Sequence, residues 1–232
     1  MKAIIRSVLI VLLFSFSYVV HAQDINAVLQ KARQKLESVN DYEATGRMKT
    51  NVAFLKVPVA TVKVYFKKPD KLSIKSEKGV SFIPKGAVSI NLNNIIAKGK
   101  FTVFDAGTDK INGVTVRIAK LLPEDDNSDV VLSTLYIDDA TGLIRKAKTT
   151  TRENGTYELE MTYGKYSAYG LPDKLIFSFN TKDYKLPKGV TFDFDDGSKQ
   201  PSPDKMKNRK GRAEIVFSSY IVNKGVSDAL FK

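Results

Sequence analysis

Hydrophobic and polar residues alternate along residues 42–77, and a proline interrupts the pattern twice, at Pro58 and Pro69. In the middle run, lysines fall on one face and apolar side chains fall on the other: Val62, Val64 and Phe66. A period of two residues is typical of a strand with one buried and one solvated face. Proline marks turns because it cannot donate to a central ladder. The stretch therefore predicts three paired strands, whose apolar face must be covered.

An amphipathic helix is predicted before these strands, over Asp24–Asn40. Its apolar residues recur at steps of three and four: Ile25, Val28, Leu29, Ala32, Leu36 and Val39. Asp24 is placed to cap the first turn, and Asn40 with Asp41 ends the helix. We expect the apolar stripe of this helix to lie on the sheet that follows it.

Strand patterns continue through the second half of the chain. Three alternating runs separated by turn residues predict an antiparallel meander: Val130–Tyr136, Leu143–Arg152 and Tyr157–Met161. Further strands are predicted at residues 101–104, 114–119, 175–179 and 213–220, with a turn-rich link over Asp105–Gly113. The predicted fold class is α+β, mainly antiparallel β.

Two segments interrupt the strand pattern. Val80–Gly99 is apolar but broken by Pro84-Lys85-Gly86, and we expect a covering loop with short strand or helix there. Residues 181–211 are polar and rich in proline and lysine, which predicts a long loop. The length of residues 23–232 suits a single β-rich domain.

Residues 1–22 have the pattern of a secretory signal peptide. Lys2 and Arg6 precede the apolar run Val8–Val20, and His21-Ala22 completes a compact cleavage site before Gln23. A membrane-spanning anchor is the alternative, but the run is shorter than the ~20 residues that a bilayer requires. The chain has no cysteine for a disulfide or a lipid attachment. We expect export to a bacterial periplasm.

The catalytic groups left to the mature chain are few. The single histidine, His21, lies in the signal peptide, so no Ser-His-Asp or Cys-His arrangement can form. Paired carboxylates, as in glycosidases, are an alternative, but the acidic residues fall mainly in turns and tryptophan is absent. The acidic run Glu124–Asp129 lacks the glycine and distal glutamate of an EF-hand loop. We expect no enzyme, no cofactor and no metal site, with calcium at this run as the alternative.

A binding role agrees better with the composition. The charge of +12 falls to +10 when Lys2 and Arg6 leave with the signal peptide, and this charge still favours anionic headgroups or acidic partners. The lysines do not form a nucleic-acid motif with aromatic residues, so no nucleic acid is expected. An apolar sheet face with few helices to cover it favours a hydrophobic ligand such as an acyl chain. The predicted lining is Met48, Phe54, Val62, Val64, Phe66, Leu72, Ile74, Phe82, Ile90 and Leu92. The alternative is a dry core in which these side chains pack against one another.

The segment VYFKKPDKLSI and the order of elements resemble the periplasmic outer-membrane lipoprotein carriers of the Lol system and their wider carrier-like superfamily, of the lipoprotein-sorting type. The resemblance covers nearly the whole mature chain. It implies an unclosed half-barrel whose concave apolar face is covered by helices or loops and takes acyl chains. In that family a basic residue before the turn proline, commonly arginine, helps to keep the lid closed, which implies a lid contact for Lys68. Leu72 matches an apolar position of the cavity.

The predicted function is that of a monomeric periplasmic carrier. It would bind the acyl chains of lipoproteins or lipids and ferry them toward the outer membrane, between a membrane-bound donor complex and an outer-membrane acceptor. The alternative is a lipid-sensing envelope regulator or binding module with the same fold, which would show a stable protein partner. The fold alone does not choose between them.

Overall fold

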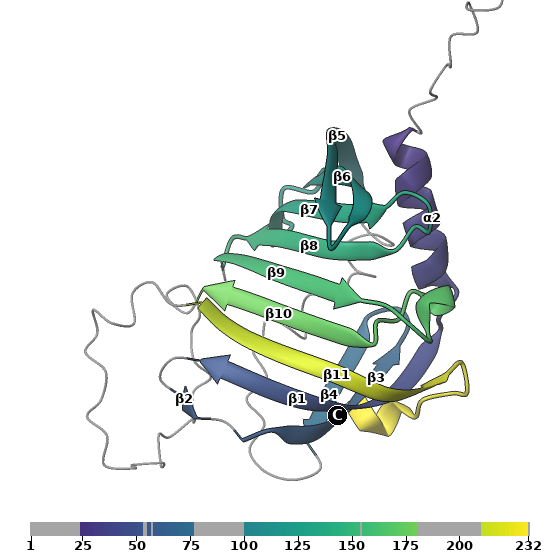
Figure 1. The fold of residues 1–232 in the computed structure, drawn as a ribbon, viewed down its shortest axis with the longest axis vertical. Helices are drawn as coiled ribbons and strands as arrows, with labels where there is room; N and C mark the ends of the chain where they lie inside the picture. Colours follow the sequence, from purple (N-terminus) through teal and green to yellow (C-terminus); the bar gives the residue numbers. More distant parts are fainter. Residues whose placement is uncertain are drawn as a thin grey trace, which may run out of the picture.

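A computed structural model gives the structure of this chain and describes residues 24–52, 55–56, 58–76, 100–153, 155–180 and 210–231. The predicted signal peptide at 1–22, the predicted covering segment Val80–Gly99 and all but the last two residues of the predicted loop at 181–211 lie outside the described residues. The described chain begins with the helix α2 (Ile25–Glu37) and continues almost entirely as strands (Figure 1). None of the described helices is long and apolar enough to cross a membrane.

Every described strand belongs to one antiparallel sheet with the order β4-β3-β1-β11-β10-β9-β8-β7-β6-β5, and β2 pairs with β1. The strands are β1 (Asp41–Val52), β2 (Leu55–Lys56), β3 (Ala60–Lys67), β4 (Lys71–Ser76), β5 (Phe101–Ile111), β6 (Val114–Pro123), β7 (Val130–Asp138), β8 (Ile144–Thr151), β9 (Gly155–Thr162), β10 (Lys174–Asn180) and β11 (Lys210–Val222). Two short 3₁₀ helices complete the elements, η2 (Ser167–Tyr169) and η3 (Asp228–Phe231). Because β4 and β5 at the two ends do not pair, the sheet is an unclosed half-barrel, and the predicted fold class is confirmed.

The predicted helix and the three N-terminal strands are confirmed. Asp24 caps α2, since its side chain accepts a hydrogen bond from the backbone N–H of Asn26. In β3 the even-numbered side chains from Val62 to Phe66 are buried, as the alternation predicted. Tyr65 is also buried although it lies on the opposite face with the lysines.

The register of the strands defines one inner face for the whole sheet. Met48 on β1 pairs with Ile215 on β11, which pairs with Leu175 on β10, which pairs with Met161 on β9. Side chains that face each other across neighbouring strands point to the same side of a sheet. These four residues therefore mark the inner face, and the opposite side is the outer face.

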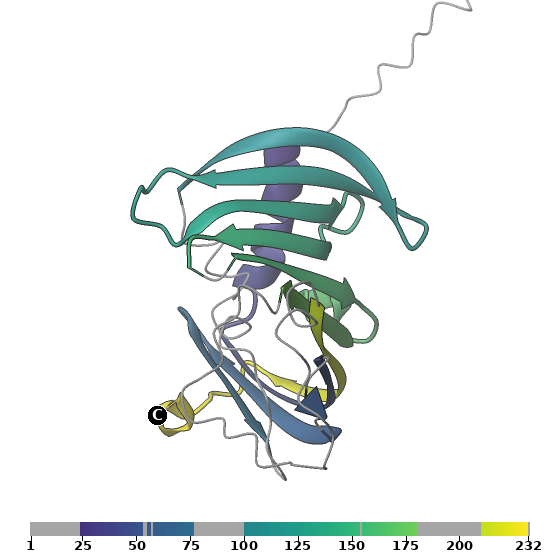
Figure 2. The ribbon, with the colours of Figure 1, turned by 90° about the vertical axis from the view of Figure 1, so that its left-hand side faces the viewer.

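Helix α2 covers the inner face over β6–β10, as Figure 2 shows from the outer side, with the helix crossing behind the upper strands. Its buried residues contribute to a first cluster with the inward side chains of these strands. The buried members of this first cluster are Ile25, Val28, Leu29, Ala32, Ala119, Leu121, Leu135, Ile137, Ile144, Ala147, Tyr157, Leu159, Met161, Phe177, Phe179 and Ala213. The predicted docking of the helix on the sheet is confirmed.

The prediction of a turn-rich link over Asp105–Gly113 is wrong. Strand β5 runs on to Ile111, and the turn is confined to Asn112 and Gly113, whose φ angles are positive. The register between β5 and β6 shifts between Asp105 and Thr108, and Gly107, at φ +84°, lies in this bulge. The turn-forming residues thus lie in a bulge of an exposed edge strand, where such irregularities are tolerated.

A second bulge bends the pair of strands that joins the two ends of the chain. The register between β1 and β11 shifts after Thr45, so that Gly46 faces Phe217. A Cβ atom on Gly46 would lie 2.8 Å from the carbonyl oxygen of Val216 and 3.0 Å from Ile215. Glycine at this position lets the two backbones approach closely on the inner face.

Candidate functional site

The candidate site is a second apolar cluster on the inner face, built by β1, β3, β4 and β11. Its buried members are Val39, Ala44, Met48, Ala60, Val62, Val64, Phe66, Leu171, Ile215 and Tyr220, and its half-buried members are Tyr42, Leu72, Ile74, Tyr166, Phe217 and Val222. Val62 is fully buried, and Met48 and Phe66 are each 2% exposed. Most of the apolar surface of the second cluster is therefore buried by the protein itself.

The structure brings six of the ten predicted lining residues together in the second cluster: Met48, Val62, Val64, Phe66, Leu72 and Ile74. Pairing of β3 with β4 sets Val64 opposite Ile74 and Phe66 opposite Leu72, and β1 carries Met48 beside Ala60. The other four predicted residues lie outside the described residues: Phe54, Phe82, Ile90 and Leu92.

Aromatic side chains form one end of the second cluster, and sequence reasoning missed them. The ring of Tyr220 lies 4.9 Å from Tyr166, 5.0 Å from Phe217 and 5.6 Å from Tyr42, measured between centroids. Tyr42 stacks on Phe66 at 5.4 Å. The available signal was the pair of aromatic residues Phe217 and Tyr220, but the bulge separates them by three positions, so they break the period of two.

Burial controls the ionisation of these tyrosines. It raises the pKa of Tyr42 and of Tyr220 above the ordinary value of 10.0, because the interior disfavours the phenolate. The Tyr220 hydroxyl donates a 2.7 Å hydrogen bond to the carbonyl oxygen of Pro172. The aromatic end is therefore neutral, and it is anchored to the segment that follows η2.

On β1, a side chain of the inner face has a buried polar atom without a partner within the described chain. Thr50 lies on β1 two residues beyond Met48 and is 6% exposed, and its Oγ1 is buried without a hydrogen bond. By contrast, the buried hydroxyls of Ser133 and Thr149, on the same face over β7 and β8, bond each other at 2.9 Å. A buried hydroxyl without a partner is costly, and a ligand carbonyl oxygen would satisfy it.

Lys68, for which the resemblance implied a lid contact, belongs to the β3–β4 turn, and its side chain contacts the C-terminal end of α2. Its Nζ donates to the carbonyl oxygen of Glu37 at 2.6 Å and to Oδ1 of Asn40 at 3.2 Å. A cation beside the last carbonyl groups of a helix is favourable both as a hydrogen-bond donor and through the helix dipole. The β3–β4 turn is thereby connected to the helix end.

Asn223, directly after β11, holds the same helix end, and no pattern in the sequence predicted this contact. Its Oδ1 accepts from the backbone N–H of Asn40 at 2.7 Å, and its Nδ2 donates to the carbonyl oxygen of Ser38 at 3.0 Å. Asn223 has a φ of +56°, a conformation that asparagine tolerates better than most residues. We call Lys68 and Asn223, with their partners at the end of α2, the polar clasp.

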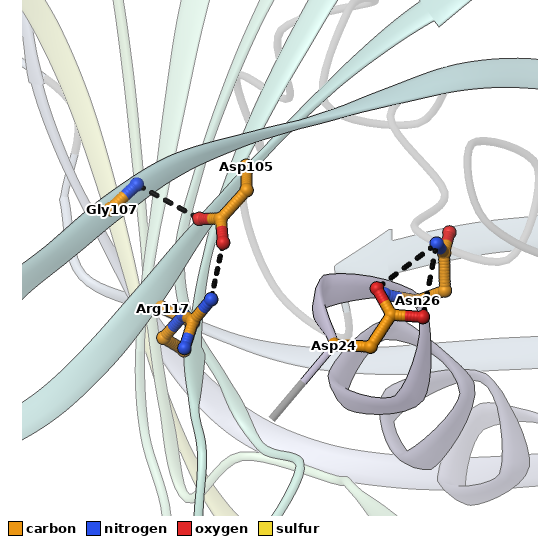
Figure 3. A network of polar contacts seen from close by, with 5 residues as sticks. All are labelled: Asp24, Asn26, Asp105, Gly107 and Arg117. Atoms are coloured by element: carbon orange, nitrogen blue, oxygen red, sulfur yellow. Dashed lines mark hydrogen bonds and ion pairs between the residues drawn. The ribbon is translucent and has the colours of Figure 1, made fainter. Parts of the chain in front are cut away.

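A charged pair lies near the other end of the helix, on the inner face (Figure 3). Arg117 on β6 bonds the carboxylate of Asp105 on β5, which also accepts from the backbone N–H of Gly107 at 2.9 Å. The bond from Gly107 and the Arg117 guanidinium lower the pKa of Asp105 despite some desolvation. Figure 3 shows this pair in the same view as the first turn of α2, where Asp24 bonds Asn26. The pair is outside both apolar clusters.

The helix-covered half of the inner face is closely packed. A crevice beside α2, lined by Ala32, Lys35, Leu36, Gly142, Leu143, Ile144, Tyr163 and Gly170, has a volume of about 10 Å³. This volume holds about one water molecule and is too small for an acyl chain. The buried residues of the first cluster pack with α2 as a core. The dry-core alternative concerned the predicted lining residues, and none of those belongs to the first cluster.

A metal-binding constellation is not found within the described residues. They contain no group of three acidic side chains close enough to hold a metal ion. Asp138 on β7 is a buried carboxylate that pairs with Arg145 at 2.9 Å, and neither residue belongs to the second cluster.

Comparison with solved structures identifies the fold, although no family model and no curated protein matches the sequence. A domain described as an outer-membrane lipoprotein-sorting protein, from Vibrio parahaemolyticus, has a TM-score of 0.55 at 12% identity and covers 89% of this chain and 95% of its own. A LolA-superfamily protein from Nitrosomonas europaea has a TM-score of 0.54 at 11% identity, with 89% and 96% covered. A DUF1329-family protein from Desulfovibrio piger has a TM-score of 0.55 at 13% identity, with 91% and 98% covered. The chain has the Lol carrier-like fold that the sequence resemblance implied.

Proposed function

We propose that this protein is a periplasmic carrier that binds acyl chains of lipids or lipoproteins against the second cluster and ferries them toward the outer membrane. The unequal cover of the inner face carries this proposal. Helix α2 packs on the first cluster, whereas the described chain places only Val39, Tyr166 and Leu171 on the second cluster from outside the sheet. A sheet face that lacks a packed helix is where a guest replaces protein.

The chemistry of the second cluster suits a hydrocarbon guest. Its side chains are aliphatic or aromatic, and its buried tyrosines remain neutral because burial raises the pKa of Tyr42 and Tyr220. Burying methylenes contributes ~0.8 kcal/mol each, so ten of them supply roughly 8 kcal/mol. The unpartnered hydroxyl of Thr50 supplies a donor for an ester or amide carbonyl at the end of the chain.

A guest must open the cover before it reaches the second cluster. Val39, Tyr166 and Leu171 lie on the segments that follow α2 and flank η2, and these segments are tied down by hydrogen bonds from Lys68, Asn223 and Tyr220. Exchanging a few such bonds for bonds to water costs little compared with unpacking a core. We therefore propose that the end of α2 moves as a lid and that the polar clasp holds it in the closed position.

Native mass spectrometry of the exported protein tests the proposal. We expect an additional mass that organic extraction removes and that corresponds to a lipid or an acylated peptide. Ala60→Phe fills the second cluster and should lower the lipid-bound fraction several-fold, whereas Thr61→Phe, at the neighbouring exposed position of β3, should leave it unchanged. Both variants are first compared by thermal unfolding, so that loss of lipid is not mistaken for loss of fold.

One result would contradict the carrier, and a further one would favour the alternative function. A protein that is purified from the periplasm without lipid, and that takes up none from added lipid extract, would contradict the carrier. A stable protein partner recovered from the periplasm by this lipid-free chain would favour an envelope regulator instead.

A further inference from the structure

The outer face of the sheet is divided into two regions of different character. Over β8–β11, β1 and β3 three ion pairs cross neighbouring strands: Lys146–Glu158 at 2.9 Å, Lys174–Glu214 at 3.0 Å and Lys63–Glu43 at 3.3 Å. Such pairs are typical of a solvated sheet surface and neutralise part of its charge, although exposed Lys49 on β1 forms no ion pair with a described residue. The region over β5–β8 differs because two lysines there lie beside exposed aromatic and aliphatic side chains.

Four exposed residues form an outer patch over β5–β8: Phe104, Lys120, Leu122 and Lys148. Phe104 is 51% exposed and Leu122 is 45% exposed, although both are large hydrophobic residues in strands. The register sets Phe104 beside Lys120, Lys120 beside Thr134, and Thr134 beside Lys148. Since neighbouring strands lie about 4.8 Å apart, the patch spans roughly 15 Å. Figure 2 looks onto this face, with α2 behind it.

The lysines of the outer patch are not neutralised within the described chain. Neither Lys120 nor Lys148 forms an ion pair with a described residue. Glu158 faces Lys148 in the register, but its carboxylate pairs with Lys146. Glu124 follows the end of β6 at the border of the patch. The centre of the patch therefore combines unpaired positive charge with exposed apolar side chains.

We propose that the outer patch docks this protein on an anionic lipid bilayer. Lysine ammonium groups are attracted to anionic headgroups, and Phe104 and Leu122 are placed to enter the boundary between headgroups and acyl chains. A protein partner with a hydrophobic surface would not explain the unpaired lysines, and free anions would not explain the exposed aromatic ring. The net charge of +12 adds long-range attraction to the same kind of surface. The patch lies on the opposite side of the sheet from the second cluster, so docking does not depend on the proposed cargo.

Vesicle flotation with the full chain tests the docking. Vesicles that contain phosphatidylglycerol and phosphatidylcholine should bind the protein, and pure phosphatidylcholine vesicles should bind it far less. Lys120→Glu with Lys148→Glu should weaken binding by roughly tenfold or more, given the usual contribution of each surface lysine. The control is Lys49→Glu with Lys75→Glu, which makes the same charge change at exposed outer-face positions of β1 and β4 and should lower binding by less than half of that factor.

A second pair of substitutions separates the apolar contribution from the charge. Phe104→Thr with Leu122→Thr keeps residues that favour strands and leaves the charge unchanged, and it should weaken binding several-fold. If Lys120→Glu with Lys148→Glu and Lys49→Glu with Lys75→Glu weakened vesicle binding equally, the proposal would be overturned, because binding would then follow net charge alone. Absence of binding to phosphatidylglycerol vesicles by the unaltered chain would overturn it too and would leave the patch to a protein partner or a second copy of the chain.

Discussion

The ammonium group of Lys68 lies 2.6 Å from the carbonyl oxygen of Glu37, the last residue of α2. This bond joins the β3–β4 turn, at the edge of the second cluster, to the helix that covers the first cluster. The segment beyond the helix end carries Val39, which packs on the second cluster. A side chain of the β3–β4 turn thereby restrains the segment that carries Val39.

Lys68→Met should loosen this end of the helix without unfolding the sheet. The hydrogen bond is exposed, so its loss should lower the free energy of unfolding by only about 1 kcal/mol. Backbone amides in the last turn of α2 should exchange with deuterium several-fold faster, and amides of β8 and β9 should not change. Lys68→Arg retains a donor and should restore slow exchange; equal exchange in all three proteins would mean that the bond does not restrain the helix.

The buried hydroxyl pair of Ser133 and Thr149 gives a second prediction. Ser133→Ala leaves the Thr149 hydroxyl buried without its partner, and it should cost about 1–3 kcal/mol in urea unfolding. Replacing both residues, with Thr149→Val in the same chain, removes the unsatisfied group and should recover a large part of that loss. Additive losses in the double variant would show that the two hydroxyls do not act as a pair.

Asp138 should give the protein an acid-sensitive component of stability. Desolvation raises the pKa of Asp138, but the bonds from Arg145 and Thr141 outweigh it, and the pKa lies below its ordinary value of 3.8. A carboxylate with a lowered folded-state pKa stabilises the fold above the unfolded-state pKa, and this contribution is lost as the pH falls through the folded-state value. Stability should therefore decline below about pH 4.

Urea unfolding between pH 2.5 and 6.5 measures how the free energy of unfolding changes with pH and so checks the predicted direction. Asp138→Asn should be less stable than the unaltered chain at pH 6, and the difference should narrow as the pH falls. The exposed substitution Asp126→Asn provides the background for removing one carboxylate. A difference that grows toward low pH would contradict the assigned direction of the pKa.

Local alternation was sufficient to predict the second cluster where strands are regular. In β3 the period of two places Val62, Val64 and Phe66 inward without any bulge, and the proline turn returns the chain so that Leu72 and Ile74 share that face. The helix could also be predicted from local residues, because its apolar stripe and the capping residue Asp24 indicate the same starting point. These features depend on residues close together in sequence.

Features that depend on distant partners could not be predicted in the same way. Strand β5 contains turn-forming residues, and only its pairing with β6 shows that they form a bulge. Arg117 lies on the inner face because the register aligns it with Ile137, although apolar residues flank it on both sides in the sequence, at Val116 and Ile118. Asn223 meets Asn40 across 183 positions of sequence, and no local pattern encodes that contact.

Photocrosslinking from the second cluster tests the central claim most directly. A photoreactive amino acid replaces Val64, which is 4% exposed on the inner face, or Lys63, its neighbour on the outer face. On irradiation in the periplasm, the account predicts a covalent adduct with a lipid or an acylated protein from position 64 and little or none from position 63. Equal labelling from both positions, or no lipid adduct from position 64 in a folded protein, would contradict the binding of acyl chains on the inner face.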